Sequence, residues 1–501
     1  MDRPRLVVAA PHGRSGKTTV TIGTVAALAE RGLAVQPFKK GPDYIDPSWL
    51  SEAAGRPCRN LDLFMMGEGA TLEVFRRGTL GADLSIIEGA MGLYDGVDLE
   101  GTGSTAQLAR LLSAPILLVV DATRMTRSVA ALVTGYQHFE PDVNLAGVVL
   151  NNVARTRHEK MLVGAIEHYC GIPVLGCIPR MPQLAIPDRH LGLVPRAEDE
   201  RLVPAIESAR RAMAEYLDLD RLLGIARSAP PLPVGEETGG RGDADAPHLP
   251  LGGAGSSQRA GPRGEGLSHH SSLSTHHCGG PKIGVMLDRV FTFYYPENLE
   301  ALERAGARLE FVDSLADLKL PEVDGLYVGG GFPEMFMGEL EANESLREDV
   351  RRHIDGGMPV YAECAGLIYL SGGIRWDDRR AEMVGALPCE VEMVAKPQGH
   401  GYSVAEVVAD SSFFRRGRTL RGHEFHHTRV VCLDRARVRF AYRLLRGSGI
   451  DPDHNDGLLV GNVLAAYTHL HAAAAPEWAE SFVEAAERQR GRLGVGGRGR
   501  G

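Results

Sequence analysis

Short apolar runs alternate with helix-compatible stretches along most of this chain. In the first half the runs are RLVVAA, AVQPFK, DLSIIEG, PILLVVDA, NLAGVVLNN and IPVLGCIP, each bounded by turn residues. Continuous apolar character of this kind is typical of strands that helices bury on both faces. The pattern therefore predicts an α/β fold with a doubly wound parallel sheet. It restarts with KIGVMLD, ARLEFVD, GLYVGGG and MPVYAECAG, which predicts a second α/β domain.

A change in composition separates the two series of strands. Residues 228–280 are rich in Gly, Pro, Ser, His and Arg and contain hardly any large apolar side chain, so this stretch cannot bury enough surface to fold. We expect a first domain, a disordered linker, a second domain and a disordered tail, which cover residues 1–227, 228–280, 281–490 and 491–501. A chain of 501 residues is long enough for two such domains.

Charge and cysteine content narrow the function classes. The formal net charge of -9 gives no general attraction for nucleic acid or an anionic membrane, and we expect small-molecule partners instead. The seven cysteines are scattered and never spaced as CxxC, which argues against a disulfide framework and favours a reducing cytoplasm. No apolar run approaches the roughly 20 residues of a membrane span, and the N-terminal run is too short for a signal peptide.

The loop PHGRSGKTTV lies between a predicted strand and a predicted helix, which is the context of a phosphate-binding P-loop. Glycines in such a loop let backbone N–H groups surround phosphate oxygens, a lysine neutralises them, and a hydroxyl ligates Mg²⁺. Pro11 stands where the usual pattern has its first glycine. The candidate nucleotide-binding residues are Gly13, Gly16, Lys17, Thr18 and Thr19.

Two charged segments follow neighbouring predicted strands. In KKGPDYIDP, Lys39 and Lys40 lie at the end of a predicted strand and acidic residues follow it. In EGAMGLYDG, Glu88 and Asp95 follow the predicted strand DLSII. Open α/β sheets bind ligands at the carboxyl ends of their strands, so these side chains indicate a ligand site. Magnesium that bridges nucleotide phosphates takes one or two protein carboxylates. The predicted metal ligands are Thr18, Asp43 and Glu88.

The segment MPVYAECAGLIYLSGG predicts a strand, a sharp turn at Cys364 and a helix. Small neighbours permit a strained turn that exposes a nucleophile at a helix N-terminus, whose dipole favours the thiolate. GGGFPE supplies flexible backbone donors, so Gly330, Gly331 and Ala365 are the predicted oxyanion donors. The base is predicted in AAYTHLH, at His469 or His471, and the competing histidines in GHEFHHT are His423, His426 and His427.

Six motifs together resemble the cobyrinic acid a,c-diamide synthases of cobalamin biosynthesis: APHGRSGKTT, KKGPDYIDP, EGAMGLYDG, AECAG, GHEFHHT and GNVLAAYTHLH. The resemblance implies a synthetase domain like dethiobiotin synthetase fused to a class I glutamine amidotransferase-like domain. ATP and Mg²⁺ would activate the a and c acetate carboxylates of a corrin as acyl phosphates, and ammonia from glutamine would displace phosphate. Cys364 would be the nucleophile and His469 its base. The activation site would include Lys40, Asp43, Tyr44, Asp46 and Asp95.

Several alternatives stay open at this point. His471 stands where many class I domains have a carboxylate, so the third member of the triad is not identified. Hydrogenobyrinate and nickel sirohydrochlorin are alternative acceptors that would show the same motifs, and cobyric acid synthase is a less favoured relative. A partitioning-type switch ATPase is a remote alternative, although His12 replaces its signature lysine. The sequence does not decide whether the chain forms a homodimer.

Overall fold

The computed structural model describes residues 3–181, 184, 188–189, 192–193, 202–232 and 279–496. Most of the linker predicted over 228–280, and residues 497–501 of the predicted tail, lie outside these residues. The last helix continues to Gly496, so the domain end predicted at residue 490 falls inside a helix. Within the described ranges, no helix is long and apolar enough to cross a membrane.

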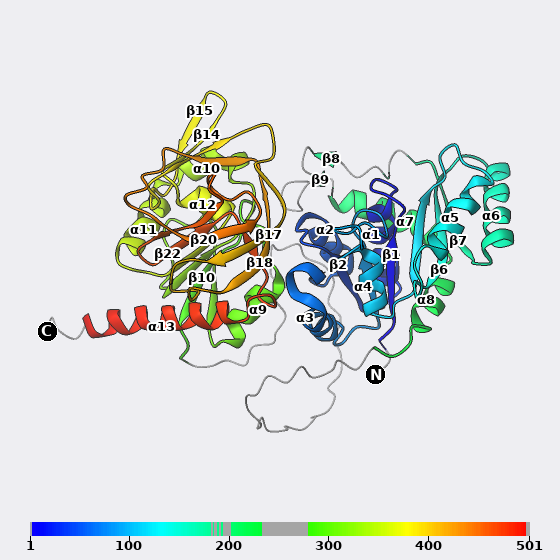
Figure 1. Cartoon of the computed structure of the whole chain (residues 1–501), viewed down its shortest axis with the longest axis horizontal. Helices are drawn as coiled ribbons and strands as arrows, with labels where there is room; N and C mark the ends of the chain where they lie inside the picture. The colour runs from blue at the N-terminus through cyan, green and yellow to red at the C-terminus, as the bar shows by residue number, and fades with distance from the viewer. Residues whose placement is uncertain are drawn as a thin grey trace, which may run out of the picture. The chain divides into compact units, whose positions relative to one another are not determined.

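The first domain is built on a seven-stranded parallel sheet with the order β3-β2-β4-β1-β5-β6-β7. Figure 1 labels β1, β2, β6 and β7 of this sheet. The predicted apolar runs form all of these strands except β3, which is three residues long. The bounds are β1 (Arg5–Ala9), β2 (Val35–Lys40), β3 (Arg59–Leu61), β4 (Leu84–Glu88), β5 (Ile116–Asp121), β6 (Leu145–Val153) and β7 (Val174–Pro179). A short antiparallel pair, β8 (Asp188–Arg189) and β9 (Gly192–Leu193), follows them.

Helices cover both faces of this sheet because each strand is apolar on both sides. Along β1, Leu6 and Val8 contribute to one core, whereas Val7 and Ala9 contribute to the other. The first core contains apolar residues of α1 (Lys17–Glu30), α2 (Ile45–Ala54), α7 (Leu202–Tyr216) and α8 (Leu219–Arg227). The second contains those of α3 (Leu63–Gly78), α4 (Thr105–Leu111), α5 (Ser128–His138) and α6 (Thr156–Cys170). The doubly wound prediction is confirmed.

The second domain contains a ten-stranded mixed sheet with the order β11-β10-β12-β13-β22-β21-β20-β17-β18-β23. Its parallel part consists of β10 (Lys282–Met286), β11 (Arg308–Val312), β12 (Gly325–Val328), β13 (Val360–Glu363) and β22 (Val463–Ala466). Its antiparallel part consists of β17 (Gly399–Val407), β18 (Thr419–His426), β20 (Arg439–Arg446), β21 (Asn455–Val460) and β23 (His469–Leu470). A smaller sheet contains β14 (Gly373–Trp376), β15 (Arg379–Glu382), β16 (Glu390–Met393) and β19 (Thr428–Val431).

Two cores hold this second sheet. One is shared with α9 (Pro296–Arg304) and α13 (Glu477–Gly496), whose Trp478 and Phe482 are buried. The other is shared with α10 (Met337–Ala342), α11 (Glu344–Asp355) and α12 (Ala365–Leu370), and the 3₁₀ helix η3 (Pro333–Phe336) lies next to α10 in the chain. Because β13 and β22 are adjacent at the centre, the segments that follow them, with Cys364 and His469, are brought to the same region of the sheet.

Candidate active site

The P-loop connects β1 to α1 and has a backbone that only glycine accommodates at one point. Gly16, the residue before α1, has a φ of 92°, and a Cβ there would lie 2.2 Å from Nδ2 of Asn151. The Asn151 side chain also donates a hydrogen bond to the carbonyl oxygen of Ser15. The carbonyl oxygen of Pro11 accepts a hydrogen bond from Tyr136, so the loop is held where the usual first glycine is missing. Gly13 is exposed, with open space around its missing side chain.

Lys17 and Thr18 begin α1 and point toward neighbouring strand ends. Lys17 Nζ donates a hydrogen bond to the carbonyl oxygen of Met91 at 3.2 Å. Burial, assisted by the charge of Lys39, lowers the pKa of Lys17 to about 8. Thr18 Oγ1 donates to Glu88 Oε1 at 2.6 Å, and Thr19 next to it is half-buried. The helix N-terminus therefore presents an ammonium, a hydroxyl and backbone N–H groups to an anion.

A cluster of one cation and three carboxylates lies at the ends of β2 and β4, with its lysine and Glu88 buried and the other two acids half-buried. Lys39 Nζ hydrogen-bonds to Asp46, lies 3.2 Å from Glu88 Oε1 and lies 3.6 Å from Asp43 Oδ2. Burial alone would lower the pKa of Lys39, but the charges of these carboxylates outweigh it and raise that pKa well above its ordinary value. Burial raises the pKa of Glu88, and burial together with the Asp46 charge raises the pKa of Asp43 to about 7. The excess negative charge is suited to a further cation.

Four of the predicted activation residues line one cavity of about 500 Å³. They are Lys40, Asp43, Tyr44 and Asp95. The fifth, Asp46, is engaged with Lys39 instead. Burial lowers the pKa of Lys40, although the Asp62 carboxylate opposes this effect. The same cavity is lined by His423 and His469 of the second domain, so side chains predicted for the two half-reactions face one space.

Cys364 occupies the sharp turn between β13 and α12, with φ 47° and ψ -94°. A positive φ is uncommon for a residue with a side chain and places the thiol apart from both the strand and the helix. The thiol is buried and lies in a pocket with Phe293, Gly331 and Phe425. Contrary to the thiolate expectation, burial, assisted by the charges of Glu334 and Glu363, raises the pKa of Cys364. The short helix α12 does not outweigh desolvation, so a base is required to form the thiolate.

The predicted oxyanion donors differ in availability. The backbone N–H of Gly330 donates a hydrogen bond to the carbonyl oxygen of Phe293 at 3.3 Å, which corrects the assignment of Gly330 as a free donor. Gly331 lines the thiol pocket, and Ala365 follows the nucleophile directly at the start of α12. These two residues remain the candidates. Position 330 requires glycine for a steric reason instead, because a Cβ there would lie 2.6 Å from Cε1 of His469.

The candidate base His469 is 1% exposed and is packed between rings. His423 stacks on it with ring centroids 4.8 Å apart and an interplanar angle of 11°. His423 itself hydrogen-bonds to the hydroxyl of Tyr295, and burial lowers the pKa of His423 well below its ordinary value. His426 and His427 line the thiol pocket; His426 stacks on Tyr467, and burial lowers the pKa of His426 to about 4. No hydrogen bond between the Cys364 thiol and a histidine occurs in the described ranges.

Two family models match this chain, and curated relatives align with almost all of it. Residues 6–194 match the CobQ/CobB/MinD/ParA nucleotide binding domain, and residues 282–477 match the CobB/CobQ-like glutamine amidotransferase domain. A cobyrinate a,c-diamide synthase from Magnetococcus marinus is 46% identical over 97% of this chain and 98% of its own length. Relatives of the same name from Methanosarcina acetivorans and Archaeoglobus fulgidus are 43% and 40% identical, over 96% and 98% of this chain and 95% and 99% of their own.

This chain belongs to the cobyrinate a,c-diamide synthase family. Membership confirms the predicted resemblance, the order of a P-loop domain before a glutamine amidotransferase domain, and the activity of a glutamine-dependent, nucleotide-binding ligase. The switch ATPase alternative shares the first family model, whose description includes MinD and ParA. It does not account for the second model or for relatives that match both halves.

Thr18, Asp43 and Glu88 were predicted to bind Mg²⁺ in this member of the diamide synthase family, and their surroundings show how well each fits such an ion. Glu88 Oε2 is buried without a hydrogen-bond partner, while its other oxygen accepts from Thr18. A hydroxyl and one free carboxylate oxygen beside a P-loop fit Mg²⁺ that also binds nucleotide phosphates. Asp43 fits less well, because its Oδ1 accepts backbone N–H groups of Ile45 and Asp46. Among the described residues, no group of three or more Asp, Glu, His or Cys side chains is arranged to hold a metal ion.

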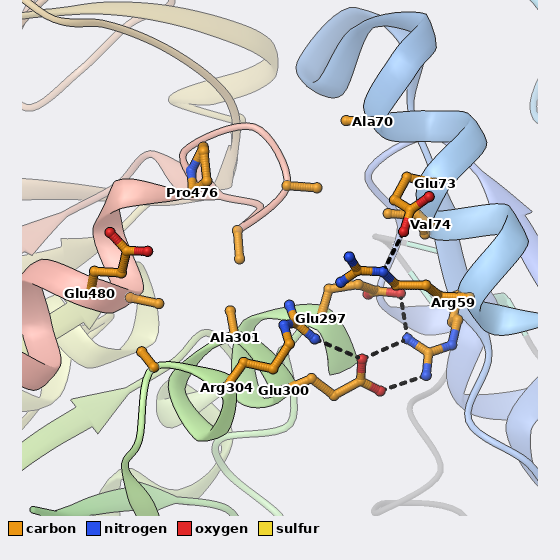
Figure 2. Close-up of a pocket in the computed structure, with 15 residues that line it drawn as sticks. Arg59, Ala70, Glu73, Val74, Glu297, Glu300, Ala301, Arg304, Pro476 and Glu480 are labelled. Carbon is orange, nitrogen blue, oxygen red and sulfur yellow. Dashed lines mark hydrogen bonds and ion pairs between the residues drawn. The ribbon is translucent and has the colours of Figure 1, made fainter. Parts of the chain in front are cut away.

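One contact between the domains was not predicted from the sequence. Figure 2 shows Arg59, at the start of β3, bound to Glu297 and Glu300 of α9 at the edge of a pocket of about 350 Å³. Glu297 Oε2 also lies 3.4 Å from Nε2 of His471. Burial would raise the pKa of Glu297, but His471 and Arg59 lower it to about 2. His471 therefore lies beside Glu297 in a cluster that reaches the synthetase domain through Arg59, which speaks against it as the base.

Proposed function

We propose that this chain uses ATP and glutamine to convert the a and c acetate carboxylates of cobyrinate into amides, in cobalamin biosynthesis. The observation that carries the proposal is the shared cavity, which is lined by Lys40, Asp43 and Tyr44 of one domain and by His469 of the other. A free carboxylate is a poor acyl donor and a glutamine amide is a poor nucleophile, so the reaction needs two activations near each other.

In the glutaminase half, Cys364 is the nucleophile and His469 the base. His469 takes the Sγ proton, the thiolate attacks the side-chain amide carbon of glutamine, and the proton passes to the departing ammonia. Gly331 and Ala365 supply N–H groups to the developing oxyanion. Water then hydrolyses the glutamyl thioester. The raised pKa of the Cys364 thiol suits this order, because the buried thiol stays protonated until a base accepts its proton.

In the synthetase half, Gly13, Gly16, Lys17 and Thr19 bind ATP, and Thr18 with Glu88 holds Mg²⁺. Mg²⁺, when bound, neutralises charge on the phosphates. The ammonium groups of Lys17 and Lys40 orient the γ-phosphate and the acetate carboxylate, whose attack on phosphorus gives an acyl phosphate and ADP. Asp46 fixes Lys39 among the carboxylates, and Asp95 lines the acceptor cavity. Ammonia then replaces phosphate to form the amide.

Aromatic side chains line the space between the glutaminase and synthetase sites. The thiol pocket and the shared cavity have Phe293 and Phe425 in common, and Tyr44 stacks on Phe293 with ring centroids 5.0 Å apart. Ammonia in bulk water is mostly protonated and is then no nucleophile. An apolar passage past these rings keeps it unprotonated until it reaches the acyl phosphate.

The acceptor is the least constrained part of the proposal. Hydrogenobyrinate and nickel sirohydrochlorin are the alternative acceptors, since both offer the same paired acetates. The deciding experiment incubates the protein with ATP, Mg²⁺, glutamine and each tetrapyrrole in turn, and follows product mass. Two successive acid-to-amide conversions on cobyrinate support the proposal. If only another tetrapyrrole is converted, that tetrapyrrole is the acceptor in place of cobyrinate. If none of them is converted, the proposed function is contradicted.

The setting of the reaction is also a proposal. We place it in the cytoplasm, where ATP, Mg²⁺ and glutamine are all supplied and where thiols such as Cys364 stay reduced. Light scattering will tell a homodimer from a monomer of 54.0 kDa.

A further inference from the structure

Glu363, the residue before the nucleophile, is a buried carboxylate to which the chemistry above gives no role. It ends β13 and is 1% exposed. Its Oε1 accepts hydrogen bonds from the hydroxyl of Tyr361 at 3.1 Å and from the backbone N–H of Leu470 at 3.0 Å. Its Oε2 accepts one from the hydroxyl of Tyr327 at 3.1 Å. Three neutral donors hold the carboxylate in place without neutralising its charge.

The same carboxylate faces the imidazole of His469. Oε2 of Glu363 lies 3.7 Å from Nδ1 of His469, slightly beyond hydrogen-bond length. In the described part of the chain Nδ1 has no hydrogen-bond partner, and it is buried. A buried ring N–H needs an acceptor, and this carboxylate lies within 3.7 Å of it. The bond from Leu470 also ties Glu363 to the backbone just after His469.

The ring of His469 has little freedom to turn away from Glu363. His423 stacks on one face, and the missing side chain of Gly330 makes room beside Cε1. His471, which stands where many class I domains have their carboxylate, is engaged with Glu297 at 3.4 Å. A carboxylate partner for His469 therefore has to come from another part of the fold.

We propose that Glu363 is the positioning residue for His469: it accepts a hydrogen bond from Nδ1–H, which leaves Nε2 free to take the proton of Cys364. The carboxylate charge stabilises the imidazolium that forms when the thiol gives up its proton. The third member of the triad is thus supplied from the position before the nucleophile. This inference rests on the proposed glutaminase chemistry.

The test is Glu363→Gln, which keeps the shape and removes the charge. We expect glutaminase kcat to fall by about 100-fold or more while KM for glutamine changes by less than about 3-fold, as for loss of a carboxylate that orients a catalytic histidine. Amidation supported by ammonium chloride in place of glutamine should persist, because the synthetase site is unchanged. Tyr361→Phe is the matched control, since it removes one hydrogen bond and leaves the charge; its kcat should stay within about 3-fold of wild type.

Other outcomes have fixed meanings. Glutaminase kcat of Glu363→Gln within about 3-fold of wild type overturns the inference, as does an equal loss in Tyr361→Phe. If Glu363→Gln also loses ammonium-supported activity, Glu363→Asp decides: partial recovery of glutaminase kcat supports the inference, and none overturns it. A wild-type protein without any glutaminase activity contradicts the proposed function instead.

Discussion

The ring centroid of Tyr44 lies 5.4 Å from that of His469, so a residue of the GPDYIDP segment in the synthetase domain contacts the candidate base of the glutaminase domain. Tyr44 is half-buried and also packs against Phe293 and Tyr295. The segment that was expected to form the activation site thus contacts the candidate base of the other domain.

Replacing Tyr44 by alanine should uncouple the two activities. Removal of the ring opens the wall beside His469, so ammonia escapes to water before it meets the acyl phosphate. We expect glutamine consumed per amide formed to rise from about one to several, with glutaminase activity largely retained. The measurement is glutamate against amide product in one reaction. Tyr44→Phe keeps the ring and should keep the ratio; an unchanged ratio in Tyr44→Ala would count against the passage.

Glu88→Gln should disable activation of the acceptor and spare glutamine hydrolysis. The substitution removes the charge that fits Mg²⁺ and that pairs with Lys39. We expect ATP-dependent amidation to drop by at least about 100-fold, the size of effect seen when one electrostatic contact to a reacting group is lost. Basal glutaminase activity serves as the internal control. Amidation by Glu88→Gln at the wild-type rate would contradict a role for Glu88 in the synthetase site.

Gly330→Ala should impair glutamine hydrolysis through the position of His469. Its Cβ would lie 2.6 Å from His469 Cε1 and 3.0 Å from Phe293 Cβ, so the imidazole has to move. A displacement of this size costs about 10- to 100-fold in rate. Ammonium-supported amidation should continue. The control is Gly164→Ala in α6, where no atom lies within 4 Å of the added Cβ; loss of activity there and not in Gly330→Ala would contradict the geometry.

Nucleotide binding should weaken as the pH rises past about 8. The pKa of Lys17 is lowered to about 8 by burial and by Lys39, so its ammonium loses a proton above that pH and no longer attracts phosphate. Because bound ATP favours the charged form, binding near pH 8 should take up a proton. Titration calorimetry in two buffers of different ionisation enthalpy measures this uptake. Affinity that is constant from pH 7 to pH 9, without proton uptake, would disagree with a titrating Lys17.

Local patterns predicted the P-loop and the turn at Cys364, because each is a strand, a loop and a helix that are contiguous in the chain. The role proposed for Glu363 could not be predicted this way, since its contact to the Leu470 backbone spans 107 residues. The same holds for Arg59, whose partner Glu297 lies 238 residues away. The prediction that Gly330 is a free donor was wrong, because the glycine-rich pattern indicates flexibility but not which carbonyl oxygen accepts a hydrogen bond from its N–H. The strand β3 was missed because three residues carry too little periodicity.

Nitrogen released from glutamine in one domain is proposed to enter the amide formed in the other, and isotope transfer follows that nitrogen. The reaction would contain ATP, Mg²⁺, cobyrinate and glutamine labelled with ¹⁵N in its amide, together with an excess of unlabelled ammonium chloride near neutral pH. Mass spectrometry of the product then reports the origin of each new amide nitrogen. We predict a diamide that carries ¹⁵N at both positions with little dilution; a diamide labelled only in proportion to bulk ammonium, or no amide at all, would contradict the account.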